Sequence, residues 1–382
     1  MIRAAPATAD DYREHARRRL PRFLFDYLDG GAGDERTLAA NVADWSERKL
    51  RQRVLVDVGA VDAATTLAGQ PCRFPVALAP VGLAGMMARR GEAQAARVAE
   101  AAGVPFTLST VGICTIDEVA SACTAPPWFQ LYMLRDRGIV AKLLERAWAA
   151  GCRTLVFTVD LPMPGMRHRD TRNGLGTSGL RARLRRAGQL LVRPGWIRDV
   201  ALRGRPLTFG NLDTYVPDAR DPDGFRAFIE AQFDPTVTWA DIASLRESWK
   251  GRLLLKGILD VDDAEAAVGV GADGIVVSNH GGRQLDGVAS TASALPAIAR
   301  AVGSRAEVLV DGGVRSGTDV FRALALGARG VLVGRPWAWA LAGAGAVGLR
   351  DLLACWRKEL HVAMALTGAT RIGEIDGSRL EP

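Results

Sequence analysis

The sequence is poor in the residues that build disulfide-linked or metal-bound scaffolds. It has five cysteines, at positions 72, 114, 123, 152 and 355, no Cys-x-x-Cys pair, and only four histidines in 382 residues. Widely spaced cysteines in odd number, most of them inside apolar runs, argue against a disulfide framework and a zinc site. We therefore expect free thiols in a reducing compartment and no bound metal.

Long hydrophobic runs are also missing. The longest uncharged run of the C-terminal half, residues 336–349, has 14 residues, which is short of the roughly 20 that span a bilayer. The N-terminus runs directly into a charged segment at 10–19, so no secretory signal is predicted. Apolar residues make up 48% of the chain, and its 42 glycines follow no fixed period. This composition is typical of a folded protein with many tight turns.

Positive charge is concentrated in one segment. Between 181 and 205 there are eight arginines and a single acid, Asp199, while the whole chain carries a formal charge of +7. The apolar residues interleaved with these arginines are Leu190, Leu191, Val192, Trp196 and Ile197. Such a mixture favours an element that binds an anionic membrane surface over one that binds nucleic acid, with a solvated loop as the alternative.

Short apolar runs that end in glycine or polar residues predict the strands. Eight such runs lie at 76–79, 105–109, 128–131, 154–159, 253–256, 274–278, 308–310 and 330–333. They are continuously apolar and do not alternate, as expected of parallel strands covered on both faces. Eight parallel strands are the number that a closed barrel requires.

Segments with helical spacing separate these runs. They lie at 91–102, 115–122, 136–150, 238–249, 260–270, 290–302 and 316–326, with a final helix at 336–349. Glycines follow several of them, and Asp260 and Ser316 can cap two helix starts. No dinucleotide Gly-x-Gly-x-x-Gly follows the first strand. The pattern therefore predicts an α/β fold, a (β/α)8 TIM barrel, and not a doubly wound sheet.

Other segments extend the barrel. We expect one domain over 1–382, with an N-terminal helical cap at about 8–48, a hairpin at 65–74 that closes the barrel base, and the barrel at about 76–349. A C-terminal helix is predicted at 349–366. The long connection 161–237 follows the fourth strand of the barrel and contains the basic segment. Loops of this length are usually functional or disordered.

The carboxyl ends of the predicted strands carry polar or glycine-rich groups, and chemistry in barrels gathers at these ends. In chain order the groups are Pro80 with Gly82, Ser109, Gln130 with Tyr132, Thr158 with Asp160, Lys256, Ser278 with His280, Asp311, and Gly334 with Arg335. A single polar residue of this kind could be a satisfied core residue. A whole ring of them predicts one site at the barrel mouth.

The last two strand ends have the character of a phosphate site. The run 311–317 reads Asp-Gly-Gly-Val-Arg-Ser-Gly and leads into a helix, and Gly334-Arg335 follows the last strand. Glycines let main-chain N–H groups approach an anion, and a helix N-terminus adds its dipole. The residues expected at the phosphate are Asp311, Gly312, Gly313, Arg315, Gly334 and Arg335.

The other strand ends suit a flavin ring attached to that phosphate. Ser109, Gln130 and Thr158 offer donors and acceptors for a ring edge rich in N–H and C=O groups. Lys256 offers a positive charge to the reduced ring, although a structural ion pair is its plainer interpretation. The sequence therefore predicts a bound flavin with a phosphate, and redox chemistry.

The remaining groups fit a small hydroxy acid. Arg167 and Arg283 can hold a carboxylate, and Tyr27 and Tyr132 can donate phenolic hydrogen bonds. His280 is the natural base because imidazole titrates near neutral pH, and Asp160 could orient it.

These motifs together resemble the FMN-dependent L-2-hydroxy acid oxidases and dehydrogenases. The run 278–286, Ser-Asn-His-Gly-Gly-Arg-Gln-Leu-Asp, is the most specific match. Further matches follow in order at 20–27, 79–83, 105–110, 128–132, 158–160, 256–257 and 311–315, so the resemblance covers almost the whole chain. Within the family, the runs 79–83, 89–92 and 256–260 look most like the respiratory lactate dehydrogenases.

The resemblance implies a role for each matched residue. His280 acts as base with help from Asp160, and Tyr132 contacts the reacting oxygen. Lys256 stabilises the reduced flavin, and hydride transfer and a carbanion route stay open as alternatives. The residues that the resemblance places on the substrate carboxylate are Arg283, Arg167 and Tyr27.

The resemblance also bears on substrate, acceptor and location. Gly82 stands where oxidases of the family often have alanine, which favours a dehydrogenase that gives electrons to a quinone or another respiratory carrier. An oxidase that makes hydrogen peroxide and a mandelate-type dehydrogenase are the alternatives to an L-lactate dehydrogenase. Val111 replaces a large aromatic of glycolate oxidase, so the pocket wall differs. We expect a homo-oligomer, peripheral on the cytoplasmic side of the inner membrane and bound through 181–205, with no nucleic-acid partner.

Overall fold

The computed structural model describes residues 5–175, 179–216 and 231–381. Eight strands of the barrel are present, each within two residues of its predicted ends: β3 (Val76–Leu78), β4 (Thr107–Ser109), β5 (Trp128–Leu131), β6 (Thr154–Thr158), β7 (Arg252–Ile258), β8 (Gly274–Val277), β9 (Glu307–Val310) and β10 (Gly330–Val333). They form one parallel sheet in the order β3-β10-β9-β8-β7-β6-β5-β4. A parallel bridge from Leu78 to Phe106 links the two outer strands. The predicted (β/α)8 barrel is therefore confirmed.

Apolar side chains fill the inside of the barrel because each strand is buried on both faces. The inner cluster consists of Leu67, Ala68, Cys72, Ala77, Ala79, Trp128, Val156, Leu254, Val276, Leu309 and Leu332. Each fully buried Leu or Val side chain contributes roughly 1.5–3 kcal/mol to folding. The interior is thus a packed core, and open space is left only toward the strand ends.

A short hairpin closes the amino-terminal end of the barrel. Strands β1 (Thr65–Leu67) and β2 (Gln70–Cys72) pair antiparallel, as predicted for 65–74. The main-chain N–H of Ala68 donates to the carboxylate of Glu307, at the start of β9. The Trp128 indole donates to Gln70 Oε1 at 3.0 Å. These contacts hold the hairpin against the strand starts.

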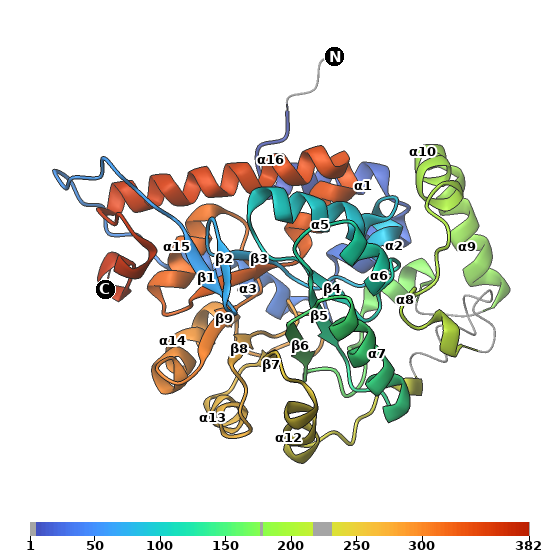
Figure 1. The fold of residues 1–382 in the computed structure, drawn as a ribbon. Coiled ribbons are helices and arrows are strands. Elements are labelled where there is room, and N and C mark those ends of the chain that lie inside the picture. The colour runs from blue at the N-terminus through green and yellow to red at the C-terminus, as the bar shows by residue number, and fades with distance from the viewer. Residues whose placement is uncertain (1–4, 176–178, 217–230, 382) are drawn as a thin grey trace.

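Helices surround the strands (Figure 1). The barrel helices are α5 (Gly91–Ala102), α6 (Ile116–Ser121), α7 (Arg137–Ala149), α12 (Trp239–Ser248), α13 (Val261–Gly269), α14 (Thr291–Val302) and α15 (Gly317–Ala325), with a short α4 (Ala84–Met87) before α5. Side chains of Asp260 and Ser316 accept hydrogen bonds from main-chain N–H groups of the first turn, as predicted.

Within the described residues, three helices precede the barrel and one long helix follows it. They are α1 (Ala9–Arg19), α2 (Arg22–Asp29), α3 (Arg36–Glu47) and α16 (Arg335–Thr367). Short 3-10 turns Ile372–Glu374 and Gly377–Arg379 end the described chain. Figure 1 shows α16 running beside α1, and the two helices pack together.

The predicted division of the last helix at residue 349 was wrong. Residues 335–367 form two helices merged across a kink at Gly345, whose φ is 68°. Only glycine adopts this backbone conformation without strain, so the break falls there although helical spacing continues beyond it. α16 is long and apolar enough to cross a membrane, but half of its most apolar 18-residue stretch is buried in the protein. We therefore describe it as a core helix.

The connection after β6 is as long as predicted, but its described part is largely helical. It contains α8 (His168–Asn173), α9 (Leu180–Leu191), α10 (Pro194–Trp196), a π-helix (Ile197–Leu202) and a 3-10 turn (Asp213–Tyr215). Residues 176–178 and 217–230 of the predicted segment lie outside the described residues. In Figure 1, α9 and α10 lie at the outer edge of the molecule, away from the strands.

The apolar residues of the basic segment divide into two groups. Trp196 is buried and donates its indole N–H to the carbonyl of Met86 at 2.8 Å. Leu190 and Ile197 pack against the core, whereas Leu191 and Val192 are exposed. Of the five apolar residues interleaved with the arginines, Trp196, Leu190 and Ile197 therefore pack on the protein, and Leu191 and Val192 are the two that are exposed. Leu180, Leu184 and Leu202 are exposed as well.

Candidate active site

A cavity of about 610 Å³ opens at the carboxyl ends of the strands. Residues at or just after the carboxyl ends of all eight barrel strands contribute to its wall, as the ring of polar strand ends predicted. Of the predicted residues, the following line it: Tyr27, Pro80, Gly82, Tyr132, Thr158, Arg167, Lys256, His280, Arg283, Asp311, Gly312, Gly313, Arg315, Gly334 and Arg335. Four others, Ser109, Gln130, Asp160 and Ser278, lie behind this wall and are linked to it by hydrogen bonds.

A chain of hydrogen bonds connects three neighbouring strand ends. The Ser109 hydroxyl donates to Gln130 Oε1 at 3.0 Å, and Gln130 Nε2 donates to the Thr158 hydroxyl at 3.1 Å. All three residues are buried. Ser109 and Gln130 are register partners on the adjacent parallel strands β4 and β5, and Thr158 is the last residue of β6, the next strand. These hydrogen bonds fix the orientation of the Gln130 amide, and Thr158 faces the cavity.

Lys256 and Asp311 form a buried ion pair at the cavity floor. Lys256 Nζ is 2.8 Å from Asp311 Oδ2 and donates to the Ser278 hydroxyl at 2.9 Å. Burial lowers the pKa of Lys256, but the charges of Asp311 and Asp160 outweigh this and raise it overall. Lys256 therefore stays protonated. Asp311 Oδ1 is buried and has no hydrogen-bond partner among the described residues.

His280 and Asp160 form the second charged pair of the site. His280 Nδ1 is 2.9 Å from Asp160 Oδ1, and the main-chain N–H of His280 donates to the Ser278 hydroxyl at 3.0 Å. Burial lowers the pKa of His280 below its ordinary value, although Asp160 acts in the opposite direction. Burial raises the pKa of Asp160, but His280 and Lys256 lower it overall. A carboxylate thus faces one nitrogen of a neutral imidazole and leaves the other free to act as a base.

A bulge in β7 makes room for Asp160. The register shifts between Lys256 and Ile258, and Gly257 between them has a φ of 112°. A Cβ at Gly257 would come within 2.7 Å of the Cβ of Asp160. Glycine is therefore required here by both the backbone conformation and the space that Asp160 occupies.

Arginines and tyrosines from four distant segments line the cavity together with His280. The Arg283 guanidinium lies 4.9 Å from the centre of the Tyr27 ring and donates to the carbonyl of Tyr27 at 2.6 Å and of Gly30 at 2.9 Å. Arg167 lies 6.0 Å from the same ring. Burial lowers the pKa of Arg283 to about 10, and the charge of Arg167 adds to this. Burial also raises the pKa of Tyr132, which keeps its phenol protonated. A carboxylate bound between the two arginines would offset their mutual repulsion.

The glycine turn after β9 is held from outside by α3. The Trp45 indole donates to the carbonyl of Gly312 at 2.8 Å, and a Cβ at Gly313 would overlap the carbonyl of Asn41. Gly312 and Gly313 have φ of 90° and 80°, which glycine alone adopts without strain. This turn and the end of β10 form one side of the cavity.

The same side of the cavity fits the phosphate and ribityl chain of FMN. Arg315 and Arg335 line it, and burial lowers the pKa of Arg315 to about 10 and that of Arg335 well below its ordinary value. A phosphate would replace the hydration that these buried cations have lost. Asp311 Oδ1 offers an acceptor for a ribityl hydroxyl, and a Cβ at Gly334 would have only one neighbour, at 4.0 Å. The residues present therefore fit the cofactor.

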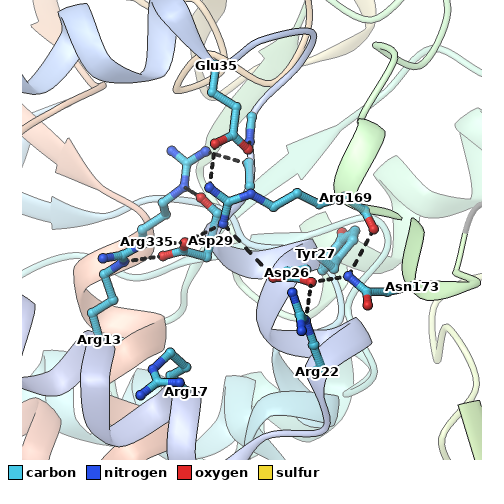
Figure 2. A network of polar contacts seen from close by, with 12 residues as sticks. Arg13, Arg17, Arg22, Asp26, Tyr27, Asp29, Glu35, Arg169, Asn173 and Arg335 are labelled. Carbon is cyan, nitrogen blue, oxygen red and sulfur yellow. Dashed lines mark hydrogen bonds and ion pairs between the residues drawn. The ribbon is translucent and has the colours of Figure 1, made fainter. Parts of the chain in front are cut away.

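The sequence pattern gave no sign of an acidic group beneath these arginines. Asp29 is buried, and its two carboxylate oxygens accept hydrogen bonds from Arg13 at 2.5 and 2.7 Å (Figure 2). One of these oxygens also accepts a hydrogen bond from Arg169 at 2.8 Å. The carbonyl of Asp29 accepts from Arg335 at 3.1 Å, and the next carbonyl, Gly30, accepts from Arg335 at 2.8 Å. Asp29 lies on helix α2, so a search for polar residues at the ends of strands could not find it.

The signature run 278–286 also has a structural part that the sequence did not reveal. Asn279 and Asn41 exchange side-chain hydrogen bonds at 2.8 and 2.9 Å, and both are buried. Asp286 accepts from the main-chain N–H groups of Asp34 and Thr37 at the start of α3. An asparagine among the apolar residues of a helix was the one signal in the sequence. The run therefore fastens the N-terminal helices to the barrel mouth as well as supplying His280 and Arg283.

Comparison with known proteins assigns this site to a family. The family model described as FMN-dependent dehydrogenase matches residues 16–382. The chain belongs to the FMN-dependent dehydrogenase family. It is an FMN-dependent oxidoreductase of 2-hydroxy acids, and the expected cofactor is confirmed as FMN by this membership.

Relatives within the FMN-dependent dehydrogenase family are similar over their whole length. An L-lactate dehydrogenase of Caulobacter vibrioides is 57% identical over 97% of this chain and 96% of its own. One from Alcaligenes faecalis is 52% identical over 98% of each chain. Among solved structures, (S)-mandelate dehydrogenase, a monotopic membrane protein, covers 99% of this chain and 100% of its own, with a TM-score of 0.91 and 31% identity. A mandelate oxidase bound to (S)-4-hydroxymandelic acid is 40% identical, with a TM-score of 0.84 and 98% coverage of both chains.

Proposed function

We propose that this chain oxidises L-lactate to pyruvate and passes the electrons to a quinone or another respiratory carrier. The observation that carries the proposal is the convergence of His280, backed by Asp160, and of the partly buried Arg167 and Arg283 on one cavity. The relatives that are 52–57% identical to this chain are named L-lactate dehydrogenase, which supports lactate over a larger hydroxy acid. The mandelate structures are 31–40% identical.

In this proposal the protein side chains bind the substrate and move its proton. Arg283 and Arg167 hold the carboxylate, and Tyr27 and Tyr132 donate hydrogen bonds to the substrate. His280 removes a proton as a neutral base, and Asp160 stabilises the imidazolium that forms. Bound FMN accepts two electrons, and Lys256 places a fixed positive charge on its side of the cavity.

The proposal about the electron acceptor rests on a different part of the cavity wall, around Gly82. A Cβ at Gly82 would approach the side chain of Val111 to 2.8 Å and the Tyr27 hydroxyl to 3.3 Å. At position 82, oxidases of the family often carry alanine. Glycine leaves the space of that methyl group open, and the Val111 side chain partly fills it. This supports a dehydrogenase, and hydrogen peroxide production is the competing activity.

We also propose that the protein binds an anionic membrane surface through 181–205. Leu180, Leu184, Leu191 and Val192 are exposed among exposed arginines of α9 and the segment after it. The monotopic membrane character of (S)-mandelate dehydrogenase, which overlays almost the whole chain, supports this proposal. Binding would bring a membrane-dissolved quinone close to the barrel, on the cytoplasmic side.

The function is tested by visible spectroscopy and kinetics. The purified protein should be yellow and should be bleached anaerobically by L-lactate without NAD. Arg283→Met should lower kcat/KM for L-lactate by about a thousandfold, because one buried charge-assisted carboxylate contact is lost. Arg300→Met, at an exposed position on α14, is the matched control and should change nothing.

Three results would contradict parts of the proposal. A preparation that carries no flavin would exclude the cofactor chemistry. Stoichiometric oxygen uptake during turnover, with no reduction of a quinone analogue, would assign the chain to the oxidases. Bleaching by L-mandelate in preference to L-lactate would correct the substrate.

A further inference from the structure

Helix α8 docks on an acidic face of α2. Asp26 and Asp29 lie three residues apart on α2 and are both buried. Residues three or four apart share one face of a helix. The partners on α8 are Arg169, 2.8 Å from Asp29, and Asn173, which donates to Asp26 (Figure 2). Arg169 and Asn173 are four residues apart, so one face of α8 meets one face of α2.

Arg169 connects three acids at once. Its Nη1 lies 2.8 Å from Asp29 and 4.0 Å from Asp26, and its Nη2 contacts Glu35 at the turn before α3. Figure 2 shows the guanidinium between these carboxylates. A planar fork with five donors can serve several acceptors, which a single ammonium group cannot do equally well. Without Arg169, Asp29 and Glu35 would lose their link to α8, and only the contact of Asn173 with Asp26 would remain between these acids and α8.

Arg167 stands immediately before α8 and has weak side-chain contacts of its own. Its Nε is 3.4 Å from the carbonyl of Arg283, and its Nη1 is 3.9 Å from Asp170. The stronger restraints act on the backbone beside it. Gly33 donates to the carbonyl of Met166 at 2.9 Å on one side, and Arg169 fixes α8 on the other. The position of Arg167 over Tyr27 is therefore set by where α8 is docked.

We propose that Arg169 is a positioning residue for substrate binding, which docks α8 on Asp29 and Glu35 and thereby holds Arg167 at the cavity. The inference rests on the proposed role of Arg167 as a ligand of the substrate carboxylate. Arg169 does not line the cavity, so its effect on the substrate passes through Arg167. Its removal should weaken carboxylate binding and leave the chemical step and the FMN site intact.

A double-mutant cycle on the FMN-loaded enzyme tests this inference. Arg169→Met should raise KM for L-lactate and the Kd of pyruvate, measured from the flavin spectrum, by about tenfold, with kcat within about twofold. Arg167→Met should raise both constants further. The variant with both substitutions should match Arg167→Met alone, because a residue that acts only through Arg167 has nothing left to position. The affinity for FMN, measured by its fluorescence on release, should be unchanged by Arg169→Met.

A matched control and a conservative variant complete the cycle. Arg22→Met removes an exposed arginine that is 3.4 Å from Asp26 but does not reach α8, so KM should stay unchanged. Arg169→Lys keeps one contact and should raise KM by about threefold. If Arg169→Met does not fold, the cycle is run with Arg169→Lys, and its effect should vanish beside Arg167→Met.

The outcomes separate this inference from the proposed function. Additive effects of the two substitutions, or an equal loss of kcat with no change in KM, would overturn the positioning role of Arg169. A KM that does not respond to Arg167→Met would instead overturn the proposed role of Arg167, whatever Arg169 does.

Discussion

At the scale of single residues, His280 is held neutral by its surroundings. Its pKa is lowered because burial disfavours the charged ring more strongly than Asp160 favours it. A histidine whose folded pKa is lowered is neutral at pH 7 and takes up a proton only when the pH falls below the ordinary pKa of histidine. The proposed base is therefore ready at neutral pH, and activity is lost on the acid side.

Replacing Asp160 separates the two influences on His280. In Asp160→Asn the contribution that raises the His280 pKa is gone, so the acid limb of kcat/KM should move to lower pH. The plateau of kcat should fall by about a hundredfold, because the imidazolium loses its carboxylate partner. The measurement is a pH profile of the unsubstituted enzyme and the variant with L-lactate. An acid limb that moves to higher pH would contradict the assignment of His280 as the titrating base.

The bulge at Gly257 offers a second residue-scale prediction. Gly257→Ala should lower kcat by about tenfold, because its Cβ would lie 2.7 Å from Asp160 and displace the partner of His280. Gly287→Ala is the matched control, since Gly287 also has a positive φ, 88°, but a Cβ there meets nothing within 4 Å. Both variants should lose roughly 1 kcal/mol of stability from backbone strain. Equal kcat values for the two would refute the argument.

Sequence alone located the residues at the ends of apolar strands and Tyr27 on α2, and it missed several others that stand on helices. Lys256 and His280 stand out because a charged or titratable side chain directly after a buried strand is seldom needed for packing. Asp29, Asn41 and Arg169 stand on helices, where a charged or amide side chain is the ordinary surface residue. Their meaning depends on which segments meet in space, and that information is not local in the chain.

At the scale of elements, α9 combines exposed leucines with arginines. Leu184, Leu191 and Val192 are 63%, 78% and 64% exposed. Changing all three to serine should abolish flotation of the protein with anionic vesicles, because the apolar contact is lost while every arginine remains. Val347→Ser, at a 55% exposed position on α16, is the control and should float normally. Flotation of the triple variant at low salt, abolished by added salt, would assign the binding to charge alone.

Element boundaries were predicted well for strands and less well for the last helix. The strands end where apolar runs meet glycine or polar residues, which is a sharp signal. Between 343 and 348 the sequence has three glycines, and nothing in the pattern says which of them takes the positive φ. The structure selects Gly345, where a Cβ would meet nothing within 4 Å. Gly343 and Gly348 are used instead for close packing on α1.

At the scale of the whole molecule, the barrel could be predicted because eight similar runs recur with helices between them. The docking of α1, α2 and α3 on the barrel could not, because it rests on single contacts such as Asp286 with the start of α3 and Trp45 with Gly312. These contacts join segments some 250 residues apart. The N-terminal helices therefore complete a site whose chemistry comes mainly from the strands.

The closed base of the barrel has a consequence for the order of events in the proposed reaction. Leu67, Ala68 and Cys72 seal the amino-terminal end, and stacked side chains fill the interior below the cavity. In the proposed reaction the hydroxy acid and the electron acceptor would then both approach the cavity from the carboxyl ends of the strands. An electron acceptor that uses the same space as the keto acid would bind only after the keto acid has left. In the interval between the two events, bound FMN would hold the two electrons.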